Sequence, residues 1–369
     1  MSASKLLLIA TMLLAMACGG SVPPVQDATA KKAADPRAVE KYVAASKLLE
    51  ADKLKANDDA QAIGLLNEAL ALDPNLWEAR HDLGVLYRRR GETRRALEEL
   101  ERAHQTAPSA DEPLLALAEA EHALGDRERA IQLLEPYAAR SPRSLPARVA
   151  LSALHREGGA YDRALAHARA ALLIAPGDLN AMLEVGRTYR EKKELDVADL
   201  VFQKAALLDA KSPRPHNELG LTALARGDTQ VAFQRFEQAL ALDTSFGAAR
   251  MNRAGVLVRA GSYERAATEY RRVLEQDESH SAARVGLGIA LRGLGKHGEA
   301  AEQYARVLAA EPNHVAALFD LAIIEREHLD KPAEAKKHFE QFLEVAPEGL
   351  AKEYAERALQ DSAGGEGGS

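Results

Sequence analysis

The sequence contains a single cysteine among 369 residues, few aromatic residues and no excess of positive charge. One cysteine cannot form an intramolecular disulfide or a cysteine-based zinc cluster, so both kinds of stabilised small domain are excluded. Aromatic residues make up 5% of the chain while hydrophobic residues make up 47%, so a core must consist largely of Ala, Leu and Val, which suits closely packed helices. A net charge of -7 with both signs interspersed excludes nucleic acid as a partner.

The first apolar run, residues 6–16, is too short for a transmembrane helix and is typical of a secretory signal peptide. The only cysteine, Cys18, follows this run directly, after the small residue Ala17. The segment resembles a bacterial lipoprotein signal, which implies removal of residues 1–17 and attachment of lipid to Cys18. The resemblance further implies a periplasm-facing protein of the bacterial cell envelope, and Gly19 after the cysteine favours the outer membrane. A second interpretation stays open, in which the tripeptide before Cys18 is an ordinary cleavage site and the cysteine is incidental.

Residues 18–42 begin with small residues and prolines, and we expect a tether and lead-in there. Beyond them a spacing of 34 residues dominates the chain. An alanine recurs at this interval at Ala62, Ala96, Ala130, Ala164, Ala198, Ala232, Ala266 and Ala300. This period is typical of a helix-turn-helix unit that stacks on copies of itself because it cannot bury its apolar face alone.

Three further positions repeat in the same phase. A small residue lies twelve places before seven of the eight alanines, where two helices have to approach closely: Gly84, Ala118, Ser152, Gly186, Gly220, Ala254 and Gly288. A glycine suited to left-handed backbone at the end of the first helix lies five places before six of them: Gly91, Gly125, Gly159, Gly227, Gly261 and Gly295. A large apolar residue lies four places after seven of them: Leu66, Leu100, Leu134, Phe202, Phe236, Tyr270 and Tyr304.

These positions resemble the tetratricopeptide repeat family, whose consensus is followed closely by LGVLYRRRGETRRALEELERAHQTAP. The resemblance implies an all-α fold, an α-solenoid of about nine 34-residue helix-turn-helix units over residues 43–349 that forms a right-handed superhelix. Residues 350–360 predict an amphipathic helix that caps the last apolar face, and residues 361–369 predict a disordered tail.

The sequence shows no pattern typical of catalysis or of metal binding. The histidines lack zinc-binding spacing, and His155 and His167, which flank a repeat turn, are interpreted as solvated helix residues. The phase of the repeat explains the glycines of GLGIALRGLG better than nucleotide binding does. We therefore expect no enzymatic activity, no cofactor, no metal and no small-molecule substrate.

In this family the first helices of successive units line a concave groove, and the residues that face it are the best functional clue. In units two to five the row is mostly charged and includes Arg156, Arg187 and Arg190, which we expect to steer an acidic partner. In units six to nine it is mostly apolar with a basic edge, and we expect it to bind a helix or an extended segment of a partner protein. The predicted partner-binding residues are Asn217, Leu221, Leu224, Met251, Asn252, Val258, Val285, Ile289, Arg292, Phe319, Ile323 and Arg326.

Asn217 and Asn252 resemble the asparagines with which some family members hold a peptide backbone. The alternative for the whole apolar row is structural, with the side chains buried against each other by the curvature or covered by the C-terminal cap. The sequence thus predicts a lipid-anchored scaffold that assembles a cell-envelope complex, such as motility, pilus or secretion machinery. A regulatory adaptor for a cell-wall hydrolase or a glycosyltransferase is the alternative function.

Overall fold

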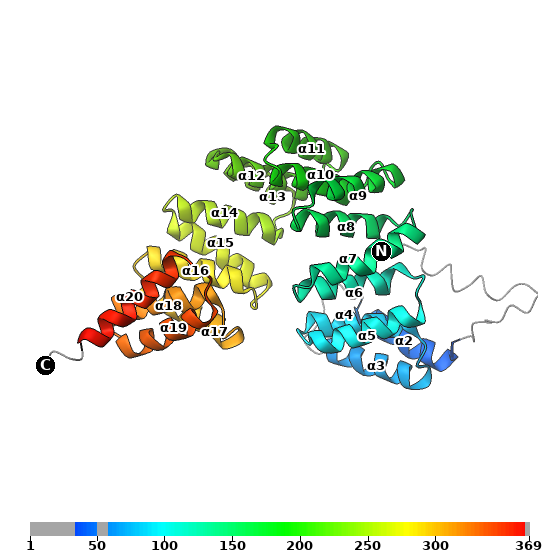
Figure 1. Cartoon of the computed structure of the whole chain (residues 1–369), viewed down its shortest axis with the longest axis horizontal. Helices are drawn as coiled ribbons and strands as arrows, with labels where there is room; N and C mark the ends of the chain where they lie inside the picture. The colour runs from blue at the N-terminus through cyan, green and yellow to red at the C-terminus, as the bar shows by residue number, and fades with distance from the viewer. Residues whose placement is uncertain (1–33, 50–57, 366–369) are drawn as a thin grey trace, which may run out of the picture. The chain divides into compact units, whose positions relative to one another are not determined.

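The computed structural model describes residues 34–49 and 58–365, with side chains described as far as residue 361. Every regular element in these segments is an α-helix, so the expected all-α fold is confirmed (Figure 1). The chain divides into two compact units, residues 1–108 and residues 109–369. None of the described helices is both long enough and apolar enough to cross a membrane. Cys18 and the predicted signal peptide lie outside the described residues.

The first unit contains the helices α2 (Pro36–Leu49), α3 (Asp58–Leu72), α4 (Trp77–Arg89) and α5 (Thr93–Thr106), and each packs on the next within the pairs α2–α3, α3–α4 and α4–α5. The first helix of this compact unit begins at Pro36, whereas the first repeat of the 34-residue pattern begins at residue 43. Proline is favoured in the first helical turn because its φ is already helical. The carboxylate of Asp35 also accepts a hydrogen bond from the backbone N–H of Arg37 at 2.9 Å, which satisfies a free donor of that turn.

The second unit contains seven helix pairs and a last single helix. They are α6 (Asp111–Ala123) and α7 (Arg127–Arg140), α8 (Leu145–Glu157) and α9 (Tyr161–Ile174), α10 (Leu179–Glu191) and α11 (Leu195–Leu208), α12 (Arg214–Arg226) and α13 (Thr229–Leu242), α14 (Gly247–Arg259) and α15 (Tyr263–Gln276), α16 (Ser281–Gly293) and α17 (His297–Ala310), α18 (Val315–Glu327) and α19 (Pro332–Val345), and α20 (Leu350–Gly365). Each helix packs on its successor, which is the arrangement of an α-solenoid. The last helix extends to Gly365, beyond the predicted end at residue 360.

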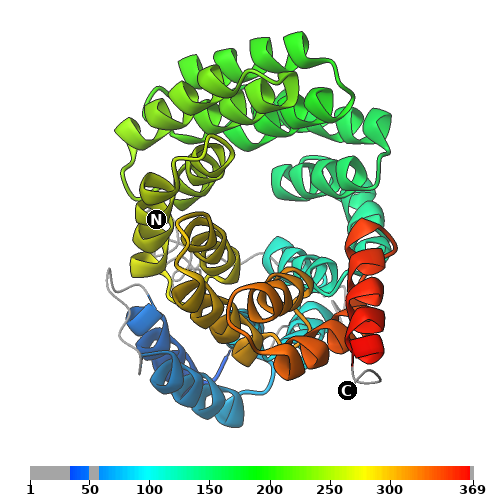
Figure 2. The ribbon, with the colours of Figure 1, turned by 90° about the vertical axis from the view of Figure 1, so that its left-hand side faces the viewer.

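Within the second unit, the first helices of neighbouring pairs also contact one another, from α6 against α8 through α14 against α16. The second helices of neighbouring pairs make no comparable contacts in this part of the described chain. The first helices therefore form the more closely spaced row, on the inner side of the stack. Figure 2 shows the green helices of this unit arranged in two such layers.

The recurring small residues are packing positions for the recurring large ones. A Cβ atom added to Gly186 or Gly220 would lie 2.4 Å from the ring of Phe202 or Phe236, and both rings are completely buried. The predicted turn glycines all have left-handed backbone, with Gly227 at a φ of 92°. Two repeats use other residues in this turn, Lys193 at a φ of 66° and Asp330 at a φ of 52°. The small and large residues that recur at fixed positions of the repeat are therefore in contact with each other in the structure.

Candidate functional site

The apolar part of the predicted groove lies on the inner row, along α12, α14 and α16. Leu221 and Leu224 of α12 are partly buried at the edge of the hydrophobic cluster around Phe236. Met251, Val258 and Ile289 are partly buried at the edge of the cluster that α14 to α18 form. Each of these side chains is anchored on one side by the core and presents the other side at the surface. Val285 differs, because it is only 8% exposed and belongs to the core itself.

At the C-terminal end of the row, α20 covers apolar residues of α18. The ring of Phe319 contacts the rings of Phe342 at 5.0 Å, Phe339 at 6.3 Å and, from α20, Tyr354 at 5.8 Å between centroids. Ile323 packs at the edge of the same cluster. The predicted capping helix therefore occupies this end of the row, and the accessible apolar surface lies on α12, α14 and α16.

The polar residues of the predicted groove are paired with neighbours. The side-chain nitrogen of Asn252 donates a hydrogen bond to the side-chain oxygen of Asn217 at 2.8 Å, and Asn217 is only 6% exposed. Arg292 forms an ion pair with Asp320 at 2.7 Å. The last member of the basic edge, Arg326, lies 3.3 Å from Asp361 of α20. Carboxylates of the chain itself thus neutralise much of the basic edge.

The charged half of the row contains a ladder of ion pairs, in which the arginines expected to steer an acidic partner contact glutamates of the chain itself. Arg187 contacts Glu184 at 2.7 Å and Glu218 at 2.6 Å, and Arg190 also contacts Glu218 at 2.6 Å. Arg156 contacts Glu184 at 3.0 Å. Glu184 and Glu218 are 4% and 3% exposed, and a buried carboxylate is stable only when it is paired. Burial alone would raise the pKa of Glu218, but Arg187 and Arg190 outweigh it and hold that pKa below its ordinary range.

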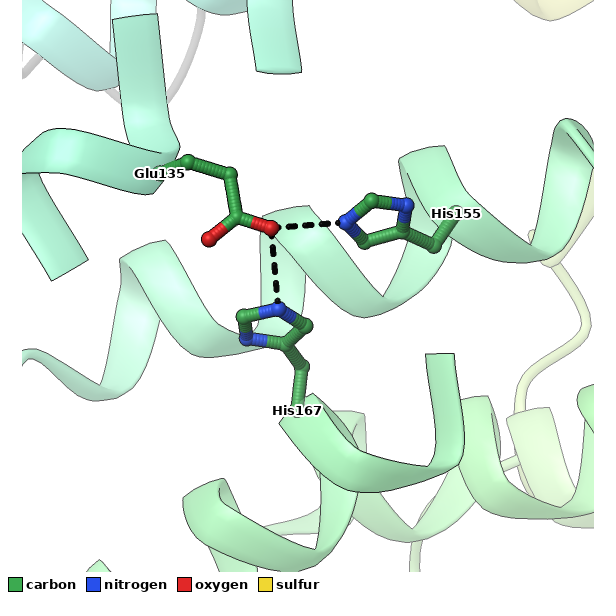
Figure 3. A group of neighbouring side chains, drawn as sticks. All are labelled: Glu135, His155 and His167. Carbon is green, nitrogen blue, oxygen red and sulfur yellow. Dashed lines mark hydrogen bonds and ion pairs between the residues drawn. The ribbon is translucent and has the colours of Figure 1, made fainter. Parts of the chain in front are cut away.

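A second polar cluster joins Glu135 of α7, His155 of α8 and His167 of α9 (Figure 3). One carboxylate oxygen, Glu135 Oε1, lies 2.9 Å from His155 Nε2 and 3.4 Å from His167 Nε2. The two imidazole rings are stacked with centroids 5.4 Å apart. The histidines are 3% and 9% exposed, so the interpretation of both as solvated helix residues is wrong. The packing of α7, α8 and α9 buries them and supplies the carboxylate.

The repeat itself holds a signal for part of this cluster. In three other repeats an arginine of the first helix pairs with a residue nineteen places later in the second helix: Arg80 with Glu99, Arg250 with Glu269, and Arg284 with Gln303. In the fourth repeat the corresponding pair is Arg148 and His167, with Arg148 Nη1 3.3 Å from His167 Nδ1. Comparing these positions between repeats identifies His167 as a residue paired with the partly buried Arg148. No such comparison points to Glu135, because it comes from the preceding repeat.

Comparisons with known proteins agree with the fold. Models described as tetratricopeptide repeat match residues 65–98, 87–154, 223–287, 257–321 and 316–349. The structure is similar to a tetratricopeptide repeat protein from Parabacteroides merdae, at 15% identity and a TM-score of 0.58 over 69% of this chain and 99% of that one. It is also similar to a chain in the Cut9–Hcn1 hetero-tetramer of the APC/C, at 15% identity and a TM-score of 0.53 over 88% of this chain and 66% of that one. At this identity the likeness concerns the fold alone. No curated protein sequence matches the chain.

Proposed function

The chain belongs to the tetratricopeptide repeat family, and we propose that it is a non-enzymatic, lipid-anchored scaffold that assembles a complex of the bacterial cell envelope. A scaffold for protein-protein interaction is the role that the fold itself suggests, because stacked helix pairs present long surfaces to a partner. The finer proposal adds the anchor, the compartment and the binding face.

The observation that carries the proposed binding face is the row of partly buried apolar side chains on α12, α14 and α16. Leu221, Leu224, Met251, Val258 and Ile289 continue from one first helix to the next, and the core holds each in place. Side chains fixed in this way lose little further conformational freedom on binding, which favours them as anchors for a partner. A partner helix or extended segment with apolar residues on one face fits such a row.

The proposed anchor rests on the sequence alone. Cys18 is the only cysteine and directly follows the apolar run of residues 6–16. Acylation there would hold the repeats beside a membrane through the tether that follows. A scaffold in that place suits an envelope machine for motility, pilus assembly or secretion, whose parts have to be gathered at the membrane.

Crosslinking in native membranes followed by recovery of the tagged chain tests the binding face. We expect Met251→Glu combined with Ile289→Glu to reduce recovery of the partner by at least about tenfold, because a charge placed at an apolar anchor opposes its burial. A matched control places the same charges on the second-helix side, with Leu200→Glu and Leu207→Glu of α11, since these leucines are 66% and 86% exposed.

The control variant should recover the partner as the wild type does, and circular dichroism should show the same helix content for all three proteins. Undiminished recovery with the groove variant, or an equal loss with the control variant, would contradict the proposed face.

A further inference from the structure

The cluster of Glu135, His155 and His167 lies outside the apolar row, and the scaffold function does not use it. We propose that it binds one divalent transition-metal ion of the zinc class through Glu135 Oε1, His155 Nε2 and His167 Nε2. Among the described residues, these three side chains bring one ligand atom each within 4.8 Å of one another. They come from three successive helices, so the site is formed by packing of the repeats.

Two of the three distances between the ligand atoms are close to those of an occupied site, and the nitrogens of the two histidines lie within 4.8 Å of each other. Zinc binds nitrogen and oxygen ligands at about 2.0 to 2.1 Å, which places two ligand atoms of a tetrahedron about 3.3 Å apart. Glu135 Oε1 lies 2.9 Å from His155 Nε2 and 3.4 Å from His167 Nε2. Small rotations of the side chains therefore suffice to admit the ion, and its bonds to the ligands replace the two contacts with Glu135.

The chemistry of the three ligands selects the class of ion. Two imidazoles and one carboxylate suit zinc and neighbouring transition metals, whereas magnesium and calcium prefer oxygen ligands. The side chain of Glu135 is 42% exposed, so the ion has an entry path from solvent, and water has access to the fourth coordination position. The carboxylate also balances part of the charge of the ion.

Arg148 controls the proton on His167. Because Arg148 Nη1 is a donor and lies 3.3 Å from His167 Nδ1, the neutral imidazole accepts there and carries its proton on Nε2, which faces Glu135. Metal binding at Nε2 requires this proton to move to Nδ1, where two donors would then face each other. Arg148 has to turn away from the ring, although its Nη2 donates to the backbone oxygen of Ala138 at 3.0 Å. The arginine therefore opposes metal binding.

The proposed ion links two repeats. Glu135 belongs to the second helix of one repeat, and the two histidines belong to the first and second helices of the next. An ion that binds the folded junction and not the unfolded chain stabilises the folded state. Once the ion concentration exceeds the dissociation constant, this stabilisation grows with the logarithm of the ion concentration.

Titration of the full chain in detergent, without a polyhistidine tag, tests the site with Co²⁺ and Zn²⁺. We expect one ion per chain by calorimetry, and visible absorption bands of four-coordinate Co²⁺ that Zn²⁺ abolishes. Glu135→Gln should weaken binding at least about tenfold, and His155→Gln or His167→Gln at least about 100-fold, because loss of a ligand exceeds the effect of outer-shell changes. Arg148→Gln should tighten binding, since its amide oxygen can accept from the Nδ1 proton of the metal-bound imidazole.

His216→Gln is the matched control, because His216 is a partly buried histidine of α12 outside the cluster, and this variant should bind as the wild type does. Circular dichroism should show a retained fold for each variant. Glu135→Gln keeps the test decisive if a histidine variant misfolds, because Glu135 is half-exposed and both rings remain. Absence of binding by the wild type, or binding that Glu135→Gln leaves unchanged, would overturn the proposal.

Discussion

The packing of Gly220 against Phe236 makes a quantitative test of the repeat structure possible. In the substitution Gly220→Ala, the new Cβ would lie 2.4, 2.7 and 2.9 Å from three ring atoms of Phe236. Carbon atoms in contact prefer about 3.5 Å or more, so the ring has to move by about 1 Å. Phe236 is completely buried, and close-packed cores leave a buried ring little space to move.

Such overpacking costs about 1 to 3 kcal/mol. Alanine is also favoured over glycine within a helix by about 0.5 to 1 kcal/mol, which offsets part of the cost. We therefore expect Gly220→Ala to lower the free energy of unfolding by about 1 kcal/mol, within a range of about 0 to 2.5 kcal/mol. Gly255→Ala is the matched control, because Gly255 lies within the next first helix and has nothing within 4 Å of an added Cβ. It should gain about 0.5 to 1 kcal/mol from the helix preference alone.

Urea unfolding followed by far-ultraviolet circular dichroism measures both variants. The midpoint should fall for Gly220→Ala and rise for Gly255→Ala. Because each repeat contacts only its neighbours, the transition of Gly220→Ala should also broaden as the repeats around α12 unfold first. Two shifts of the same sign would refute the argument that close approach, and not backbone preference, determines which positions of the repeat require glycine.

The remaining predictions concern the anchor and the ion-pair ladder. Metabolic labelling with palmitate should mark the wild-type chain but not Cys18→Ala, and equal labelling of both would contradict lipid attachment at Cys18. Because the folded pKa of Glu218 is depressed, its stabilising effect is present above the ordinary value of 4.5 and is lost as the pH falls through the lower folded value. Glu218→Gln should therefore be less stable than the wild type at pH 7 by about 3 kcal/mol. The urea midpoints of the two proteins should converge as the pH is lowered below about 4.5. A difference in midpoint that stays constant with pH would show that the ion pairs of Glu218 are not the source of the stability difference.

The 34-residue period of the sequence was by itself sufficient to predict the fold as a stack of helix pairs. A repeat is stabilised by contacts within a helix pair and with the next pair, so every contact type recurs in the sequence at a constant interval. The contacts of Gly186 with Phe202 and of Gly220 with Phe236 correspond to a small and a large residue that recur at two fixed positions of the repeat. The left-handed turn at Gly227 corresponds to a glycine that recurs at a third position. The composition change after Asp35 likewise coincides with the start of the first described helix at Pro36.

The tertiary structure alone decided which side chains are free to act. The position of a residue within the 34-residue repeat assigns it to a face of its helix. It does not show which charged or aromatic residues of neighbouring helices contact it. The repeat pattern placed Arg187 on the groove face, where we expected it to steer a partner. The structure shows that it is paired with the buried Glu184 and Glu218. Phe319 likewise looked like a groove residue until α20 was placed against it.

The cluster of Glu135, His155 and His167 shows the same limit most clearly. Its members lie 20 and 12 residues apart along the chain, in three different helices, and match no metal-binding spacing. The periodic pattern determined that these helices stack, because stacking depends on apolar residues that recur in every repeat. Which polar atoms meet between them depends on residues that occur once, and only the packed side chains determine that.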